Sequence, residues 1–319
     1  MVRLMDLTRP AWTDDWCRRE LGSEPVDVLF ASGQMSTVTG LELADGRRVV
    51  VKARPDEAGR ATSCVRMQTS LSDAGMPVAR PLTRARYFDG LAVHAEEWRP
   101  GGEMRRGDDE EHARASGRWL AYFTELTESY IGTVEPPPTN PVWVDWHRGS
   151  GLWPSYEPFD LRALSVPMPP ELDVILKRAR YRLTATELPE ILGHADWETQ
   201  NLRWSSAEYI HTVHDWDSLA WLPEAAIVGA ASGAFASAET PTLAPVASSA
   251  AFIDEYQHAR RRRFDVEEVE IAWAASVYPA AHNSRGEILW ESAPVAWTAL
   301  REQAEERLAL GGARRMPGW

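Results

Sequence analysis

The chain has 319 residues, of which 44% are hydrophobic and 25% charged, and its formal net charge is −13. This composition is typical of a globular protein with one large domain or two lobes, and the acidic charge argues against nucleic-acid binding. No apolar run is long enough to cross a bilayer, the first residues lack the apolar core of a signal peptide, and two cysteines do not make a disulfide framework. We therefore expect a cytoplasmic protein without membrane or nucleic-acid partners, and its oligomeric state stays open.

The N-terminal residues predict a short amphipathic helix over 10–21, followed by strands over 27–53. Asp45-Gly46 is a strong signal for a hairpin turn, and the valine run after it indicates a buried strand that carries Lys52. The chain has only two lysines among 34 basic residues, so arginine was acceptable almost everywhere else and Lys52 stands out. An edge lysine with its stem along the strand is the plain alternative.

The next residues predict a helix over 57–74, which ends at Gly75, and two strands over 84–98 around an Asp-Gly turn. A connector over 98–102 follows. Residues 108–130 then carry an amphipathic helix whose apolar stripe is typical of a core.

An irregular segment rich in tryptophan and acidic residues follows a proline-rich break at 135–141. Long loops of this kind often determine specificity, although a packed surface insertion explains the same residues equally well. The candidate substrate contacts in this segment are Asp145, Trp146, Trp153 and Glu157.

The remaining chain predicts a mainly helical lobe, with helices over 170–186, 224–237, 249–275 and 293–310. Four arginines at 260–263 fall within the third of these helices. We interpret them as a solvated face with ion pairs rather than as a phosphate site.

The chain is organised around residues 191–217. They contain the sequence His194-Ala-Asp196, then Asn201 five residues after that aspartate, and Asp215 fourteen residues after the asparagine. A short hairpin between Asn201 and Asp215 would return the second aspartate to the first pair.

Phosphoryl transfer needs the groups that this segment supplies. A carboxylate must orient and deprotonate the incoming hydroxyl, and oxygen ligands must hold Mg²⁺ on the nucleotide phosphates. Asp196 fits the first role, and Asn201 and Asp215 fit the second. The spacing matches the kinase catalytic loop. Each residue alone would be an ordinary turn residue, but the set predicts a kinase-like site.

The segment His194 to Asn201, followed by Val213-His-Asp215-Trp-Asp217, resembles the aminoglycoside phosphotransferase family of kinase-like enzymes. Members of that family read His-Gly-Asp-x-x-x-x-Asn and then Ile-Asp-Trp/Phe-Glu/Asp, so the chain departs from the pattern by an alanine in place of the usual glycine. The resemblance assigns the base position to Asp196 and a supporting hydrogen-bonding role to His194. Asp217 would assist the metal or bind the substrate.

The resemblance implies a two-lobed, protein-kinase-like α+β fold. An N-lobe over 1–97 would hold a small antiparallel sheet and a nucleotide site, 98–102 would be the hinge, and 103–319 would form a helical C-lobe with the catalytic loop and a substrate-binding insertion.

The resemblance also implies a nucleotide site for ATP, with GTP not excluded, and for Mg²⁺. Lys52 would contact the phosphates, and so would the loop between the first two strands, for which a plain hairpin tip is the alternative. The main chain around Glu97 and Trp98 would bind the adenine edge, unless this segment is only a connector. The loop residues are Ser32, Gly33, Ser36 and Thr37.

One family feature has no clear counterpart. A glutamate on the helix after the lysine strand normally pairs with that lysine, but its expected position holds Cys64. Gln68 lies one turn later, and Glu57 lies at the predicted start of the helix. We choose Glu57 as the expected partner of Lys52.

The predicted function is ATP-dependent transfer of the γ-phosphoryl group to a hydroxyl of a small molecule, such as an aminoglycoside-like or other cationic antibiotic. A metabolic kinase acting on an amino sugar, a choline-like alcohol or homoserine is the alternative, so a role in antibiotic resistance stays open. A pseudokinase that binds without turnover is a rival of another class, and the missing helix glutamate and the glycine-poor loop favour it. A structural protein without a nucleotide site conflicts with Lys52 and the catalytic set together.

Overall fold

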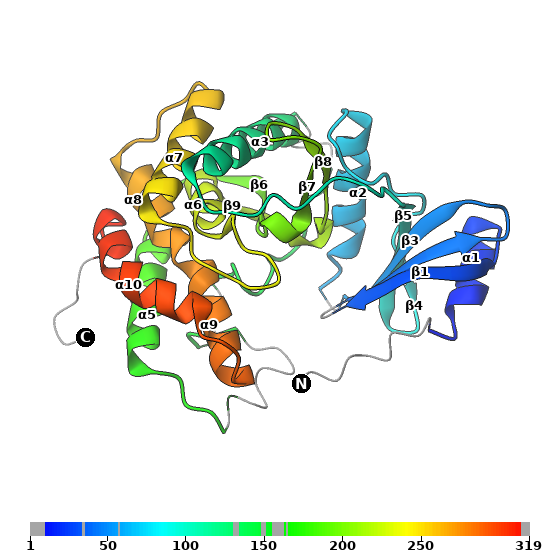
Figure 1. Ribbon diagram of the computed structural model, residues 1–319, viewed down its shortest axis with the longest axis horizontal. Coiled ribbons are helices and arrows are strands. Elements are labelled where there is room, and N and C mark those ends of the chain that lie inside the picture. Colours follow the sequence, from blue (N-terminus) through cyan, green and yellow to red (C-terminus); the bar gives the residue numbers. More distant parts are fainter. Residues whose placement is uncertain are drawn as a thin grey trace. The chain divides into compact units, whose positions relative to one another are not determined.

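The computed structural model describes residues 10–33, 36–56, 58–129, 134–147, 151–154, 163 and 165–313. These residues form two units (Figure 1). The first contains the chain up to Gly101 together with 134–139 and 212–217, and the second contains the other described residues. Both later segments lie in the part of the chain that we expected in the helical lobe. The lobe boundaries at 97 and 103 stay a prediction.

The first unit is built on an antiparallel five-stranded sheet, as predicted, in the order β1-β2-β3-β5-β4. All its strand pairs are antiparallel. Its elements are α1 (Thr13–Leu21), β1 (Pro25–Gly33), β2 (Thr37–Leu43), β3 (Arg48–Pro55), α2 (Ala61–Asp73), β4 (Arg86–Phe88) and β5 (Leu91–Glu97).

Two Asp-Gly pairs close two hairpins of this sheet. Between β2 and β3, Gly46 has a φ of 84°, and the Asp45 carboxylate accepts the Arg47 N–H at 3.0 Å. Between β4 and β5, Asp89 and Gly90 both have positive φ, 49° and 76°. Asp and Gly tolerate this left-handed region better than other residues, so the predicted turns are confirmed and they fix the register of the sheet.

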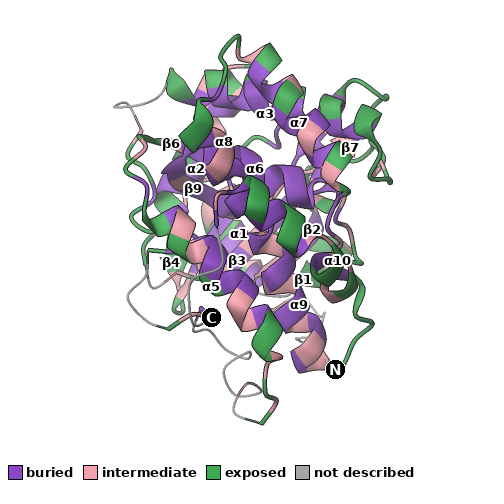
Figure 2. Cartoon of the chain, turned by 90° about the vertical axis from the view of Figure 1, so that its left-hand side faces the viewer, coloured by how far each residue is buried: buried purple, intermediate pink, exposed green. Residues whose placement is uncertain are grey.

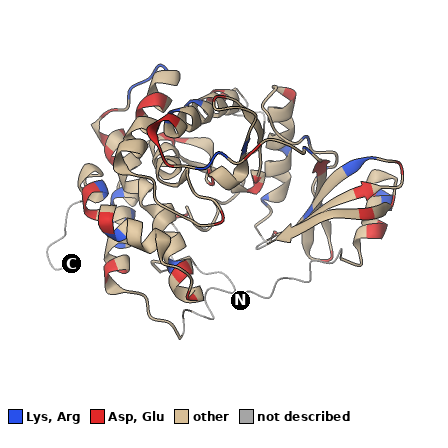
Figure 3. Cartoon of the chain, viewed as in Figure 1, with Lys and Arg blue, Asp and Glu red and all other residues tan. Residues whose placement is uncertain are grey.

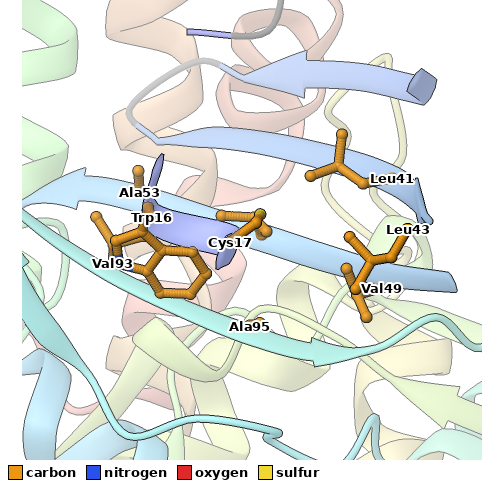
Figure 4. Close-up of a cluster of buried hydrophobic side chains, with 9 residues drawn as sticks. Trp16, Cys17, Leu41, Leu43, Val49, Ala53, Val93 and Ala95 are labelled. Carbon is orange, nitrogen blue, oxygen red and sulfur yellow. The ribbon is translucent and has the colours of Figure 1, made fainter. Parts of the chain in front are cut away.

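One face of the sheet forms the core of the first unit. Trp16 and Cys17 of α1 are fully buried against alternate residues of β2, β3 and β5 (Figure 4). Because side chains alternate along a strand, Val51 and Ala53 face this core while Lys52 points to the opposite face of the sheet. The sheet residues of the cluster are Leu41, Leu43, Val49, Val51, Ala53, Val93 and Ala95.

The second unit is mainly helical, as expected. A short strand pair, β6 with β9, and the hairpin of β7 and β8 accompany the helices. Strand β8 ends, and the 3₁₀ turn η2 begins, within residues 212–217, which cluster with the first unit. The elements are α3 (Glu110–Glu128), α5 (Pro170–Thr184), β6 (Glu190–His194), η1 (Thr199–Asn201), β7 (Leu202–Trp204), β8 (Ile210–Val213), η2 (Trp216–Ser218), β9 (Leu219–Pro223), α6 (Glu224–Ala234), α7 (Val246–Ala259), α8 (Val266–Ser276), α9 (Tyr278–Trp290) and α10 (Val295–Leu310).

Helix α6 lies at the centre of this unit. Every residue from Ala225 to Ala234 is buried (Figure 2), and the helix packs against α7 and α8. Its small side chains permit close approach: a Cβ added at Gly229 would lie 2.0 Å from the Ala272 carbonyl oxygen. A helix that is apolar on all sides belongs in a core.

The prediction of one helix over 249–275 is wrong. The chain forms α7 and α8, and the arginines at 260–263 lie between them rather than on one helix. Arg261 has a φ of 52°, which is incompatible with a continuous helix. Asp265 then begins α8 by accepting the Glu268 N–H at 2.9 Å in a capping box.

The expected ion pairs of these arginines are present, among them Arg260 with Glu224 at 3.3 Å. Acidic and basic residues are interspersed in this part of the unit (Figure 3). In the part of the chain that the structure describes, no helix combines the length and the apolar character that a membrane span requires.

Candidate active site

The predicted catalytic loop begins at the end of a supported strand in the second unit. Strand β6 pairs with β9, so that His194 lies opposite Leu219. The next residue extends this contact, because the Ala195 N–H donates to the Ser218 carbonyl at 2.7 Å. The loop then passes through η1 and enters β7. Both ends of the loop are therefore tied to regular structure.

Asp196 and Asn201 lie together in this loop. The Asn201 side-chain amide donates to Oδ2 of Asp196 at 2.8 Å and to the Asp196 carbonyl at 2.9 Å. The amide nitrogen of Asn201 is thus directed at Asp196, and its Oδ1 is the atom that can serve as a cation ligand. The Asp196 carboxylate is half-buried, which is compatible with contact to a substrate hydroxyl.

His194 supports the loop from within the core. Its side chain is 1% exposed, and Nδ1 accepts the Asp196 N–H at 3.2 Å. A buried ring that accepts a main-chain hydrogen bond acts as a support, which agrees with the role that we expected.

Lys52 has a partner that we did not predict. Its Nζ lies 3.0 Å from Oε1 of Glu96 on β5, and Glu96 is almost fully buried. Gln68 of α2 donates to the other carboxylate oxygen of Glu96 at 2.9 Å and to the Ala79 carbonyl at 2.7 Å. The helix therefore contributes an amide to this cluster, and the carboxylate comes from the sheet.

The sequence did contain a signal for Glu96. Lys52 lies opposite His94 in the β3–β5 pair, and Glu96 lies two residues further on the same face. A glutamate at an inward-facing position of a strand needs a cationic partner. Our chosen partner, Glu57, lies outside the described residues, and Cys64 at the expected helix position is buried.

Lys52 and its neighbours keep Glu96 ionised. Burial is the largest single influence and alone would raise the pKa of the Glu96 carboxyl, but the Lys52 ammonium group together with hydrogen bonds from His94 and Gln68 outweighs burial and holds that pKa well below its usual range. The buried pair is thus a fully charged ion pair at neutral pH, and Lys52 is held on the face of the sheet opposite the α1 core.

Asp215 lies in the part of the chain that clusters with the first unit. Its φ is 60°, a left-handed conformation that is uncommon outside glycine. Backbone outliers of this kind concentrate at functional sites. Asp217 forms an ion pair with Arg54, and its carbonyl accepts from Arg60 at 2.9 Å.

The predicted phosphate loop joins β1 to β2, with Gly33 opposite Thr37 and Ser32 opposite Val38. A Cβ at Gly33 would lie 2.2 Å from the Ser36 carbonyl oxygen, so any side chain there would collide with the backbone. This close approach explains the single glycine. Contacts from Ser32, Gly33, Ser36 and Thr37 to phosphate stay a prediction.

The predicted adenine contacts lie at the end of β5. The Glu97 N–H donates to the Arg80 carbonyl at 2.9 Å, so this amide is engaged within the first unit. Arg48 lies over the Trp98 ring, 5.0 Å from its centroid. Binding of adenine here stays a prediction.

The candidate substrate contacts have different environments. Trp146 is fully buried, and its ring packs edge-on against Tyr278 at 5.5 Å, which favours a packing role. The Trp153 indole donates to Asp173 at 2.9 Å. Asp145 is half-buried, and Glu157 lies outside the described residues.

The residues present fit a hard cation. Asn201 Oδ1 in the second unit and the Asp215 carboxylate in the first are each oxygen donors of the kind that Mg²⁺ prefers. Among the described residues, no cluster of three or more His, Cys, Asp or Glu side chains could hold a metal on its own. Joint binding of Mg²⁺ by Asn201 and Asp215 stays a prediction.

Two comparisons identify relatives of the chain, whereas no curated protein matches it by sequence. The sequence model described as "Phosphotransferase enzyme family" matches residues 28–264. Among solved structures, the chain is similar to an amicoumacin kinase in complex with AMP-PNP, Ca2+ and Ami, at 15% identity and a TM-score of 0.61 over 90% of this chain and 89% of that one.

Two further structures share the fold. A putative fructosamine-3-kinase from Thermobifida fusca is 16% identical with a TM-score of 0.53, over 93% of this chain and 98% of that one. A thermostable mutant of the aminoglycoside phosphotransferase APH(4)-Ia, in complex with ADP and hygromycin B, is 12% identical with a TM-score of 0.54, over 94% and 99%. The two-lobed, kinase-like fold class is thereby confirmed.

Proposed function

The chain belongs to the phosphotransferase enzyme family and is a small-molecule phosphotransferase, and from this premise we propose that it transfers the γ-phosphoryl group of ATP to a hydroxyl group of a cationic small molecule. The observation that carries the proposal is the Asp196–Asn201 pair at the head of the catalytic loop, with its 2.8 Å hydrogen bond. The complexes of two relatives with AMP-PNP and with ADP support an adenine nucleotide as co-substrate.

Asp196 acts on the acceptor in this proposal. Its carboxylate orients the acceptor hydroxyl and takes its proton while the oxygen–phosphorus bond to the acceptor forms and the bond to the ADP oxygen breaks. The Asn201 amide restrains the carboxylate through its hydrogen bond to Oδ2. Positioning of this kind supplies much of the rate acceleration in phosphoryl transfer.

Lys52 contacts the nucleotide phosphates, and Glu96 holds its ammonium group in place at 3.0 Å. Asn201 and Asp215 hold Mg²⁺, which when bound neutralises charge on the β- and γ-phosphates. The loop residues Ser32 to Thr37 cover the phosphates, and the main chain near Trp98 contacts adenine.

The net charge of −13 supports a cationic acceptor. The resistance and metabolic alternatives differ only in that acceptor. A pseudokinase is disfavoured because Lys52 has a buried carboxylate partner. Glu96 takes the place of the missing helix glutamate.

The test is release of nucleoside diphosphate from Mg-ATP and Mg-GTP against a panel of aminoglycosides, peptide antibiotics, amino sugars, choline and homoserine. We expect acceptor-dependent ADP release that the Asp196→Ala variant loses. Release with neutral acceptors only would contradict the cationic class. A folded protein whose thermal midpoint does not respond to Mg-ATP would contradict the nucleotide site itself, since a ligand of the folded state must raise stability.

Asp215 offers a sharper test of the metal role. Asparagine tolerates the left-handed conformation at this position, whereas alanine adds strain. Asp215→Asn should therefore retain the thermal midpoint of the parent protein and lower kcat by about 100-fold, because the charge that holds the cation is lost. Steady-state kinetics and a melting curve measure both, and full activity in a folded variant would contradict the metal assignment.

A further inference from the structure

We propose that Arg54 is a positioning residue that sets the Mg²⁺ affinity of the site, by holding Asp217 and through it the turn that carries Asp215. This inference rests on the proposed function and deepens it. Neither Arg54 nor Arg60, the two arginines that contact Asp217, was a candidate in the sequence. Asp217 was assigned to the metal or the substrate.

The turn around Asp215 is anchored at its first end to a segment of the same unit. The Val213 N–H donates to the Pro77 carbonyl at 2.8 Å, and Val213 forms a parallel bridge with Val78. Trp216 is 2% exposed, and its indole donates back to the Val213 carbonyl at 3.0 Å. The chain is therefore fixed on both sides of Asp215, at Val213 and at Trp216.

The second end is anchored by two arginines. Arg54 of β3 forms an ion pair with the Asp217 carboxylate, with 13% and 27% of the two side chains exposed. Arg60 donates to the Asp217 carbonyl at 2.9 Å. The largely buried ion pair is shielded from solvent, so it constrains geometry more strongly than a surface pair would.

Arg60 is itself held in a fixed position. The Asp56 carboxylate accepts the main-chain N–H groups of Arg60 and Ala61 at 2.8 and 2.9 Å, at the start of α2. The Tyr87 hydroxyl donates to the same carboxylate at 2.7 Å. The carbonyl of Asp217 is thus bound by the guanidinium group of a residue whose main chain is fixed at the start of α2.

Arg54 shares its strand and its face of the sheet with Lys52. It lies two residues after Lys52 on β3, so both side chains lie on the same face of the sheet. One strand therefore carries the lysine for the phosphates and the arginine that holds the turn of the metal ligand. Residues that support a metal ligand from outside the coordination sphere typically change metal affinity by about 10- to 100-fold when they are mutated.

The left-handed backbone of Asp215 makes this support necessary. An aspartate at a φ of 60° is less stable than in the common regions of conformation, so without anchors the turn would relax and move its carboxylate. Val213 and Asp217 are both anchored and only three residues lie between them, so the turn has no freedom to relax. The ion pair with Arg54 is the anchor that a single substitution can remove without changing the main chain.

The experiment measures nucleotide binding rather than turnover, so it needs no acceptor. The thermal midpoint is recorded with saturating ATP across a Mg²⁺ titration, which gives the Mg²⁺ concentration at half-maximal stabilisation. We expect Arg54→Gln and Asp217→Asn each to raise that concentration about tenfold, while stabilisation by ATP without Mg²⁺ stays as in the parent protein. Arg54→Lys, which keeps the charge, should restore part of the loss.

The double variant R54Q/D217N distinguishes the proposed route from independent roles. If both residues act through one contact, the double variant needs no more Mg²⁺ than the weaker-binding single variant. Additive effects, or an effect of Asp217→Asn alone, would overturn the proposal. Arg47→Gln is the matched control, because Arg47 forms an exposed ion pair with Asp45 in the turn between β2 and β3, and its titration should not change.

Failure of the proposed function gives a different result. If Mg-ATP does not stabilise the parent protein, the assignment of the nucleotide site is overturned, and this inference with it. A normal response of the unchanged protein, with an equally normal response of folded Arg54→Gln, would overturn only the role of Arg54. Should Arg54→Gln fail to fold, Arg54→Lys and Asp217→Asn carry the same comparison.

Discussion

Asp196→Asn should lower kcat by about 10²- to 10⁴-fold, the usual contribution of a general base, with little change in the free energy of unfolding. The asparagine can no longer take the proton of the acceptor hydroxyl. Its side-chain oxygen can still accept the hydrogen bond of 2.8 Å from Asn201, so the loop retains its support. Initial rates of ADP release and urea denaturation curves measure the two quantities.

A neighbouring carboxylate provides the control for this prediction. Glu198 lies two residues further in the same loop, is 7% exposed, and accepts from the Gln200 side chain at 2.8 Å. Glu198→Gln should keep kcat within a few-fold of the parent value. Equal loss in both variants would point to disruption of the loop, and retained turnover in Asp196→Asn would contradict the base assignment.

Local signals in the sequence account for the parts of the fold that were predicted. The Asp-Gly turns define two hairpins because few residues adopt their positive φ values. The strand with Lys52 follows from a run of valines, and α1 follows from apolar residues at helical spacing. The Asp196–Asn201 pair was predictable because both residues lie in one loop of six residues, so their approach depends on local geometry.

The features that were missed depend on contacts between distant residues. Lys52 meets Glu96 only through the register of β3 against β5, and Asp217 meets Arg54 across more than 150 residues of sequence. The break between α7 and α8 was hidden because its arginines are good helix formers. Tertiary packing and the capping box of Asp265 override that preference.

Glu96→Gln should lower the free energy of unfolding by about 3 kcal/mol, because Lys52 is then left with a buried, uncompensated charge. Glu96 is 3% and Lys52 14% exposed in their side chains, so solvent compensates little of the loss. The same change should lower kcat/KM for ATP by about 100-fold, since a displacement of about 1 Å at a reacting group has an effect of this size. Glu42→Gln, at an exposed ion pair of the same sheet, is the control for both measurements.

The pH dependence of stability tests the charge state of the pair. The pKa of Glu96 in the folded protein is held below its ordinary value of 4.5, so the stabilising contribution is fully present above that value and is lost as the pH falls towards the folded pKa. The difference in the free energy of unfolding between the parent protein and Glu96→Gln should therefore shrink below about pH 4.5. A difference that stays constant with pH would show that packing, and not charge, explains the effect of the substitution.

The exchange variant Q68E/E96Q moves the carboxylate from β5 to helix α2, the element on which the family pattern places the partner of the lysine. The Gln68 and Glu96 side chains are 2.9 Å apart, so a glutamate at 68 remains in the cluster with Lys52. It would face the Ala79 carbonyl, to which Gln68 now donates at 2.7 Å, and we therefore expect only partial recovery of kcat/KM and stability over Glu96→Gln. Gln68→Glu alone should be destabilising, since it adds a second carboxylate beside Glu96. If the exchange variant recovers neither kcat/KM for ATP nor the free energy of unfolding, the carboxylate must lie on β5 to hold Lys52. A carboxylate on helix α2 would then not replace it.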